Sequence, residues 1–172
     1  METREGGLML PLKKKRDKEI YREAQKAIQQ HIEAKSKLKN LKVLRSDRNV
    51  QSDFAEWIAS RILDLRLSQN PVEKSFDATD SHSKKYQIKA RVTSSLEAPT
   101  SFDFRKRPRG FDFLISIFFD GQYGVLGIAK IPCSVVIELG SQTKSRFSFR
   151  WNKRTRNDPR VEWVFLPGND NA

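Results

Sequence analysis

Residues 111–119 constrain the fold of this chain more than any other segment. Every residue of this run is apolar except Asp112 and Ser116. Because successive side chains of a strand point to opposite faces, a run that is apolar at both odd and even positions has no polar face. The run is also far shorter than the roughly 18–20 residues that a membrane-spanning helix needs. We therefore expect a central β-strand that is covered on both sides by other layers of the protein.

The segments around this strand predict a single mixed α/β domain with a basic helical extension. After a flexible tail at 1–12, helices are expected at about 13–41 and 53–67, with an irregular stretch at 42–52 between them. A hairpin is expected over 73–92, a loop over 93–109, strands over 124–131, 146–151 and 161–166, and a short helix over 132–139. The predicted organisation is an N-terminal tail and helical arm at 1–50, followed at 51–172 by an α/β domain with a central mixed β-sheet flanked by helices.

Both long helices carry an apolar stripe. In the second helix the stripe is expected to face the core, and it consists of Phe54, Trp57, Ile58, Ile62 and Leu65. In the first helix the stripe consists of Ile20, Ala24, Ile28 and Ile32, and the opposite side is rich in Lys and Gln. That polar side has two interpretations, a solvated face or an arm that contacts a phosphate backbone or a second subunit.

The hairpin carries a group of side chains suited to metal and phosphate chemistry. If its loop is 81–83, residue 80 pairs with 84 and Asp77 falls opposite Gln87. Side chains alternate along a strand, so Gln87 and Lys89 share one face. An acid, an amide oxygen and an ammonium then lie together on one side of the hairpin, which is a place to hold a divalent cation beside a phosphate.

Charge points to a polyanionic partner. The 172 residues carry a formal net charge of +12, and nucleic acid is the commonest partner of so basic a chain. A solubility surface or an anionic membrane surface is the alternative. Two basic clusters are suited to phosphate contacts from loops, although a solvated surface explains them too; their members are Arg105, Lys106, Arg107 and Arg109 in one, and Lys153, Arg154 and Arg156 in the other. The neighbouring Phe147, Phe149 and Trp151 are expected in the core.

Cysteine and histidine are too rare for several kinds of site. Cys133 is the single cysteine, so no intramolecular disulfide is possible, and we expect an intracellular, cytoplasmic protein without a membrane anchor. With only His31 and His82 as histidines, a zinc site and a Cys–His catalytic pair are not expected. Cys133 is interpreted as a small core residue.

The order of these features resembles the PD-(D/E)xK nuclease superfamily over roughly residues 51–132. The resemblance rests on Ser52-Asp53-Phe54-Ala55-Glu56-Trp57, on Phe76-Asp77, on Gln87-Ile88-Lys89, and on the later runs Phe111-Asp112-Phe113-Leu114-Ile115, Tyr123-Gly124-Val125 and Ile131-Pro132. It implies a restriction endonuclease-like fold and a metal-dependent DNA endonuclease of restriction or repair type, acting on double-stranded DNA, with a homodimer as a possible assembly.

The same resemblance assigns roles to four residues. Asp77 would bind Mg²⁺ or Mn²⁺, Lys89 would orient or activate water, and Glu56 would complete the site. Gln87 stands where the family usually has Asp or Glu, so this chain is a QxK variant, and Gln87 would contribute its amide oxygen.

Several alternatives stay open at this point. Asp53 and Glu56 have the spacing of a helix capping box, which would give Glu56 a structural role. Asp80 is a possible metal ligand but is more typical of a side chain that bonds the backbone of a turn, and His82 is expected to be exposed. Because of Gln87, the domain is alternatively a weak or inactive DNA-binding module. A basic RNA-binding protein without a metal site is the other alternative.

Overall fold

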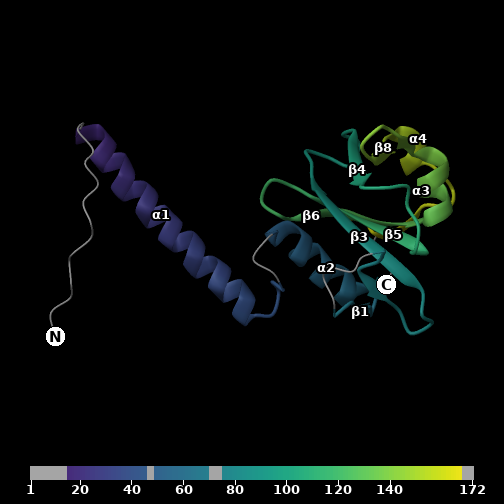
Figure 1. Ribbon diagram of the computed structural model, residues 1–172, viewed down its shortest axis with the longest axis horizontal. Helices are drawn as coiled ribbons and strands as arrows, with labels where there is room; N and C mark the ends of the chain where they lie inside the picture. Colours follow the sequence, from purple (N-terminus) through teal and green to yellow (C-terminus); the bar gives the residue numbers. More distant parts are fainter. Residues whose placement is uncertain (1–14, 46–48, 70–74, 168–172) are drawn as a thin grey trace. The chain divides into compact units, whose positions relative to one another are not determined.

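The computed structural model describes residues 15–45, 49–69 and 75–167, and its contacts divide the chain after Arg45 into two compact units. The first unit holds one long helix, α1 (Lys15–Asn40), close to the predicted bounds (Figure 1). Its apolar side chains are exposed, with Ile20 at 52%, Ile28 at 59% and Ile32 at 56% of their full accessibility. The predicted tail at 1–12 lies outside the described residues.

The second unit is a mixed α/β domain, as predicted. It begins with α2 (Val50–Ile62) and contains a six-stranded mixed sheet in the order β1-β2-β3-β5-β6-β9. These strands are β1 (Arg66–Leu67), β2 (Ala78–Thr79), β3 (Lys85–Val92), β5 (Phe113–Phe119), β6 (Val125–Pro132) and β9 (Glu162–Phe165). The remaining elements are β4 (Thr100–Phe104), α3 (Cys133–Leu139), β7 (Ser141–Gln142), β8 (Phe147–Trp151) and α4 (Lys153–Arg156).

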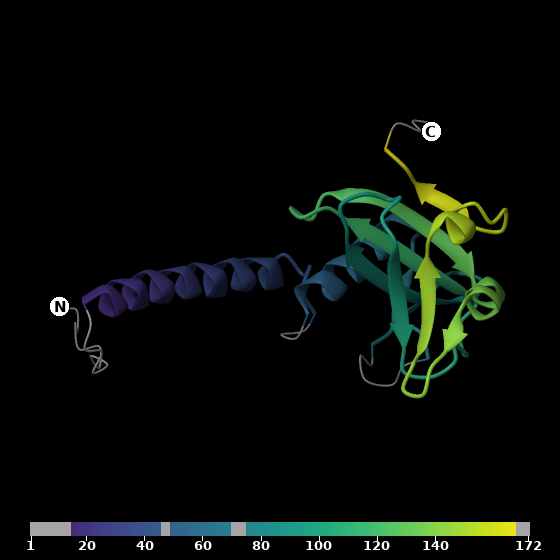
Figure 2. The ribbon, with the colours of Figure 1, turned by 90° about the horizontal axis from the view of Figure 1, so that it is seen from above.

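β5 is the centre of the domain and confirms the expectation for residues 111–119. It pairs in parallel with β3 and antiparallel with β6, and all its residues except Phe113 are buried. Ile115 and Ile117 pack with α2 and with the buried residues of β3, whereas Leu114 and Phe118 pack with β4, β8 and α3. The large sheet is therefore the middle layer, with α2 on one face and the smaller sheet on the other (Figures 1 and 2).

The bounds of α2 differ from the predicted 53–67 at both ends. Asn49 is the N-cap, because its backbone is extended and its side chain accepts a hydrogen bond from the Ser52 N–H at 3.1 Å. Asp53 lies one turn inside the helix, so the predicted capping box of Asp53 and Glu56 is wrong. The helix ends at Ile62 because Asp64 takes a left-handed backbone conformation with φ of 51°.

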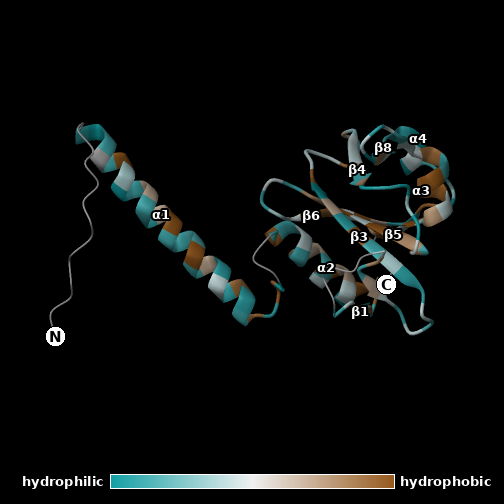
Figure 3. Cartoon of the chain, viewed as in Figure 1, coloured by the Kyte–Doolittle hydropathy of each residue, from teal (hydrophilic) through white to brown (hydrophobic). Residues whose placement is uncertain are grey.

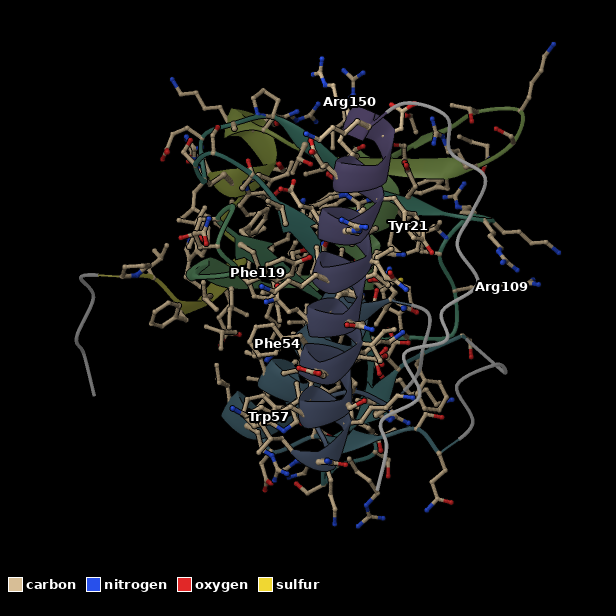
Figure 4. The ribbon with its side chains drawn as sticks, turned by 90° about the vertical axis from the view of Figure 1, so that its left-hand side faces the viewer. Tyr21, Phe54, Trp57, Arg109, Phe119 and Arg150 are labelled. Carbon is tan, nitrogen blue, oxygen red and sulfur yellow. The ribbon has the colours of Figure 1, made fainter. Side chains whose placement is uncertain are left out.

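The inward stripe of α2 is present only in part. Ile58 is buried, and Phe54 is half-buried with its ring stacked on Phe119 at 5.6 Å and on Trp57 at 6.3 Å (Figure 4). Ile62, however, is 50% exposed. Leu65 is buried from the segment after the helix, where the early end of α2 places it.

The predicted loop at 93–109 contains a strand that sequence analysis missed. This strand, β4, pairs antiparallel with β8, which pairs with β7, and the three form a second sheet. Its residue Phe102 is fully buried and meets Phe118 of β5 edge to face at 5.7 Å. The confirmed core positions Phe147, Phe149 and Trp151 belong to the same sheet. The second sheet is therefore part of the folded core and not a surface appendage.

Replacing Phe102 tests this role of the second sheet. Phe102→Ala should lower the free energy of unfolding by about 3–5 kcal/mol, because it leaves a cavity between the two sheets. Phe165→Ala, at a 39% exposed position of edge strand β9, is the matched control and should cost much less. Urea unfolding of both variants measures the difference. Equal losses would mean that β4 contributes little to the core.

Candidate functional site

The hairpin has the register that the sequence predicted. Ala78 pairs with Tyr86 and Thr79 with Lys85, so Asp77 lies opposite Gln87. The Asp77 N–H donates to the Tyr86 carbonyl at 2.7 Å, which continues the pairing by one residue. The order of side chains across the two strands is therefore fixed by backbone hydrogen bonds.

Asp80 holds the turn of this hairpin. Its Oδ1 accepts hydrogen bonds from the backbone N–H groups of His82 and Lys84, both at 2.9 Å, and its Oδ2 accepts one from the Tyr86 hydroxyl at 2.9 Å. Burial and the Asp80 carboxylate raise the pKa of Tyr86 to about 12. His82 is exposed, as expected. Asp80 therefore acts as a turn residue and is not placed as a metal ligand.

Asp77 is a buried carboxylate at the centre of the candidate site. Its side chain is on a residue only 5% exposed, and its Oδ2 accepts hydrogen bonds from the Ile88 N–H at 2.8 Å and from Gln87 Nε2. Gln87 therefore bonds to Asp77 through its amide nitrogen. Within the described part of the chain, the Gln87 carbonyl oxygen accepts no hydrogen bond. These contacts orient the carboxylate and the amide toward each other.

Lys89 lies on the same face, two residues after Gln87. Its ammonium nitrogen is 4.7 Å from the centre of the Phe104 ring of β4. Burial lowers the pKa of Lys89, and the negative charge of Asp77 opposes that shift. Among the residues that the structure describes, no carboxylate lies within ion-pair distance of Lys89. A half-buried cation is thus held by an aromatic ring and by the field of Asp77.

Glu56 comes from the other side of the sheet. Tyr86, Ile88 and Ala90 pack with α2, which means that Gln87 and Lys89 face the second sheet. The structure brings together Asp77, Gln87 and Lys89, whereas Glu56 is half-buried on the helix that covers the opposite face. Over residues 15–45, 49–69 and 75–167, no cluster of three or more His, Cys, Asp or Glu side chains could hold a metal ion. The oxygen ligands that this face offers a cation are those of Asp77 and Gln87.

Sequence analysis missed three polar residues near Lys89. Arg91 shares its face, donates from Nε to the Ser101 carbonyl at 2.8 Å and lies over the Phe102 ring. Asp103 forms an ion pair with Arg146 at 3.2 Å and adds negative charge near Lys89. Ser116 pairs with Lys89 across β3 and β5, and its buried hydroxyl has no hydrogen-bond partner. The period-two pattern of β3 could have found Arg91, but Asp103 and Ser116 depend on long-range pairing.

The first basic cluster directly adjoins this site. Arg105, Lys106, Arg107 and Arg109 are exposed on the loop that follows Phe104, and Arg109 projects outward in Figure 4. The loop ends at Gly110, whose φ of 84° suits glycine, and a Cβ there would be 2.5 Å from that of Ser75. The loop therefore starts below Lys89 and ends against the segment that leads into Asp77.

The second basic cluster lies at the other end of the smaller sheet. α4 follows Trp151, which pairs with Thr100, the residue of β4 farthest from Phe104. Lys153 and Arg154 are exposed there, whereas Arg156 donates to the Leu96 carbonyl at 3.1 Å and so has a structural contact. The two predicted clusters are thus separate surfaces of the domain.

Comparisons with known proteins gave no relative for this chain. Neither the scan against protein-family models nor the search of curated proteins returned a match. None of the described helices is both long enough and apolar enough to span a bilayer.

The depressed pKa of Lys89 has a testable effect on stability. The unfolded chain binds this proton more tightly than the native protein, so the charged lysine disfavours folding below its native pKa, and stability rises as the pH increases toward the ordinary value of 10.5. Lys89→Met should therefore raise the free energy of unfolding at neutral pH, and the gain should shrink as the pH approaches 10.5. Chemical denaturation between pH 7 and pH 10.5 measures both effects.

Lys130→Met is the matched control for this prediction. The Lys130 ammonium also lies over an aromatic ring, at 4.6 Å from the centre of Phe113, but it forms an ion pair with Glu162 at 3.2 Å. Removing it should not stabilise the protein. A loss of stability in Lys89→Met at neutral pH would contradict the strain assigned to the Lys89 charge.

Proposed function

We propose that this chain is a metal-dependent nuclease of restriction endonuclease-like type that hydrolyses DNA phosphodiester bonds at the β2–β3 hairpin. The observation that carries the proposal is the grouping of Asp77, Gln87 and Lys89 on one face of that hairpin. A buried carboxylate, an amide and an unpaired ammonium are an expensive combination to keep in a folded domain, and such combinations concentrate at functional sites.

The donor set fits a hard divalent cation. Mg²⁺ and Mn²⁺ prefer oxygen ligands and are often held by one or two carboxylates together with water and substrate phosphate. Asp77 would supply the carboxylate and Gln87 its carbonyl oxygen, while Glu56 would act from α2 only through water. The chemistry that the cation supplies when bound is a lowered pKa of bound water and partial neutralisation of the phosphate.

Lys89 would bind the phosphate that is to be cleaved. Its ammonium is half-buried and has no ion pair among the described residues, so an arriving phosphate oxygen would relieve the cost of its charge. As negative charge develops on the phosphate oxygens, the same ammonium would stabilise it. The Phe104 ring and the field of Asp77 keep the ammonium in place before substrate arrives.

DNA would be held mainly through its backbone. The loop with Arg105, Lys106, Arg107 and Arg109 runs from the Lys89 side of the site to the Asp77 side and exposes four cations. Contacts of this kind give affinity and orientation without reading sequence. The formal net charge of +12 supports the same class of partner.

A DNA-binding module without cleavage is the second candidate, and Gln87 favours it. This residue brings no negative charge to the hairpin group, which leaves Asp77 as its one carboxylate. In that case the site would bind a backbone phosphate through Lys89 and would hold a cation weakly.

Cleavage of supercoiled plasmid DNA with Mg²⁺ or Mn²⁺ tests the proposed activity. Asp77→Asn and Lys89→Met should each reduce nicking by about a hundredfold or more, because each removes a group that touches the cation or the phosphate. Gln87→Glu should preserve or increase it by adding a charge to the donor set. Lys130→Met, the matched cation on the other face, should cleave normally.

Melting temperatures of the same variants separate lost chemistry from lost folding. Full nicking by a folded Asp77→Asn protein would refute the assignment of Asp77. Metal-independent binding of duplex DNA with no nicking by the unaltered protein would support the binding module instead.

The salt dependence of DNA affinity tests the basic loop. Each phosphate contact on duplex DNA contributes about 0.9 to the slope of log affinity against log salt concentration, so Arg105→Ala combined with Lys106→Ala should lower that slope by up to about 1.8. Fluorescence anisotropy with two unrelated duplexes should show similar losses for both. The paired control is Lys153→Ala with Arg154→Ala, at the far end of the sheet, where a smaller loss is expected. A larger loss for the control would move the binding surface to α4.

A further inference from the structure

α1 presents an apolar stripe that nothing in its own unit covers. Along it, the residues of the stripe recur at alternating spacings of four and three; they are Ile20, Ala24, Ala27, His31, Ala34, Leu38 and Leu41. All of these side chains are exposed except that of Leu38, which is half-buried. Figure 3 shows hydrophobic and hydrophilic residues interspersed along the whole helix. Alternating four–three spacing is the pattern of a helix that pairs with another helix.

From this pattern we propose that α1 pairs antiparallel with α1 of a second copy of the chain, and that the protein is a homodimer through this helix. A lone helix of 26 residues gains little from its own hydrogen bonds in water, and its stability comes from packing an apolar face. The inference does not depend on the proposed nuclease activity, because it uses residues of the first unit only.

The antiparallel direction follows from how the stripe meets itself. When Ile20 of one copy lies level with Leu38 of the other, Ala24 lies level with Ala34 and Ala27 with His31. Two layers of large side chains then stand at the ends of the contact, and alanines in the middle allow the backbones to approach closely. In a parallel pair, by contrast, each His31 would face His31 of the second copy.

Charges beside the stripe favour the same direction. Glu23 and Lys37 are exposed and each directly precedes a stripe residue, so they lie along the same edge of the helix. In the antiparallel register Glu23 comes opposite Lys37 of the second copy, and the reciprocal pair forms at the other end. Charge pairs at such flanking positions set the partner and the orientation of paired helices.

The opposite edge of the stripe gives a third element of the fit. Ile28 lies there, is 59% exposed, and would come level with Ile28 of the second copy near the twofold axis. Ile32 lies one row farther out and stays at the margin of the contact. A second copy thus covers the most exposed isoleucine of α1 and pairs two of its unlike charges.

Sedimentation of the full chain over micromolar concentrations tests the dimer. Ile28→Glu, which would bring two carboxylates together near the twofold axis, should weaken dimerisation strongly. Glu23→Lys alone and Lys37→Glu alone should each raise the dissociation constant by about tenfold, since each replaces two attractive pairs by two repulsive ones. The double variant Glu23→Lys with Lys37→Glu should restore the original affinity.

The control variant exchanges two charges away from the stripe. Lys26→Glu with Glu33→Lys has the same net charge as the parent chain and should dimerise like it. Circular dichroism of each variant checks that the helix still forms. A chain that stays monomeric throughout, as expected if α1 packs on its own domain or serves only nucleic acid, would overturn the proposal. A double charge exchange that fails to restore the dimer would overturn the antiparallel pairing.

Discussion

The parallel pairing of β3 with β5 is the constraint on which the rest of the domain depends. Parallel neighbours cannot be joined by a tight turn, so the chain must cross over between them. Here the crossover contains β4, which leaves the large sheet, pairs with β8 and becomes an edge of the second sheet. A layer that covers the second face of β5 is thus built from the connection that parallel pairing requires.

The same crossover builds the candidate site. It carries Phe104 to a position below the Lys89 ammonium, places Asp103 nearby, and continues into the exposed basic loop that returns to the segment before Asp77. Without β4 the face of Gln87 and Lys89 would be open to solvent, and the Lys89 pKa would have no burial to lower it. The environment of the hairpin residues is therefore a product of topology.

Two features of this face oppose stability. Lys89 carries a charge that burial disfavours, and the buried hydroxyl of Ser116 across from it lacks a hydrogen-bond partner. The opposite face shows the contrasting solution, since Lys130 lies over a ring in the same way but has Glu162 as its ion-pair partner. Unbalanced polar groups on one face only are consistent with a site whose missing interactions come from a ligand.

The sequence by itself determined the elements whose signals are local. Period-two alternation and a polar turn were sufficient for the register that sets Asp77 opposite Gln87, and the unbroken apolar run 111–119 predicted a strand buried on both faces. The helix capping box failed because several polar residues before α2 can cap a helix, and only the backbone conformation of Asn49 selects one.

Tertiary structure alone decided the second sheet, the cover over Lys89, and the placement of Glu56 behind the large sheet. β4 alternates weakly in sequence and is stabilised by β8, more than forty residues later, so no local pattern marks it. Which side of a sheet a helix covers is likewise set by where its apolar face is buried, and hydrophobic burial is non-directional. Local hydrogen bonding therefore made the hairpin predictable, while long-range packing fixed what surrounds it.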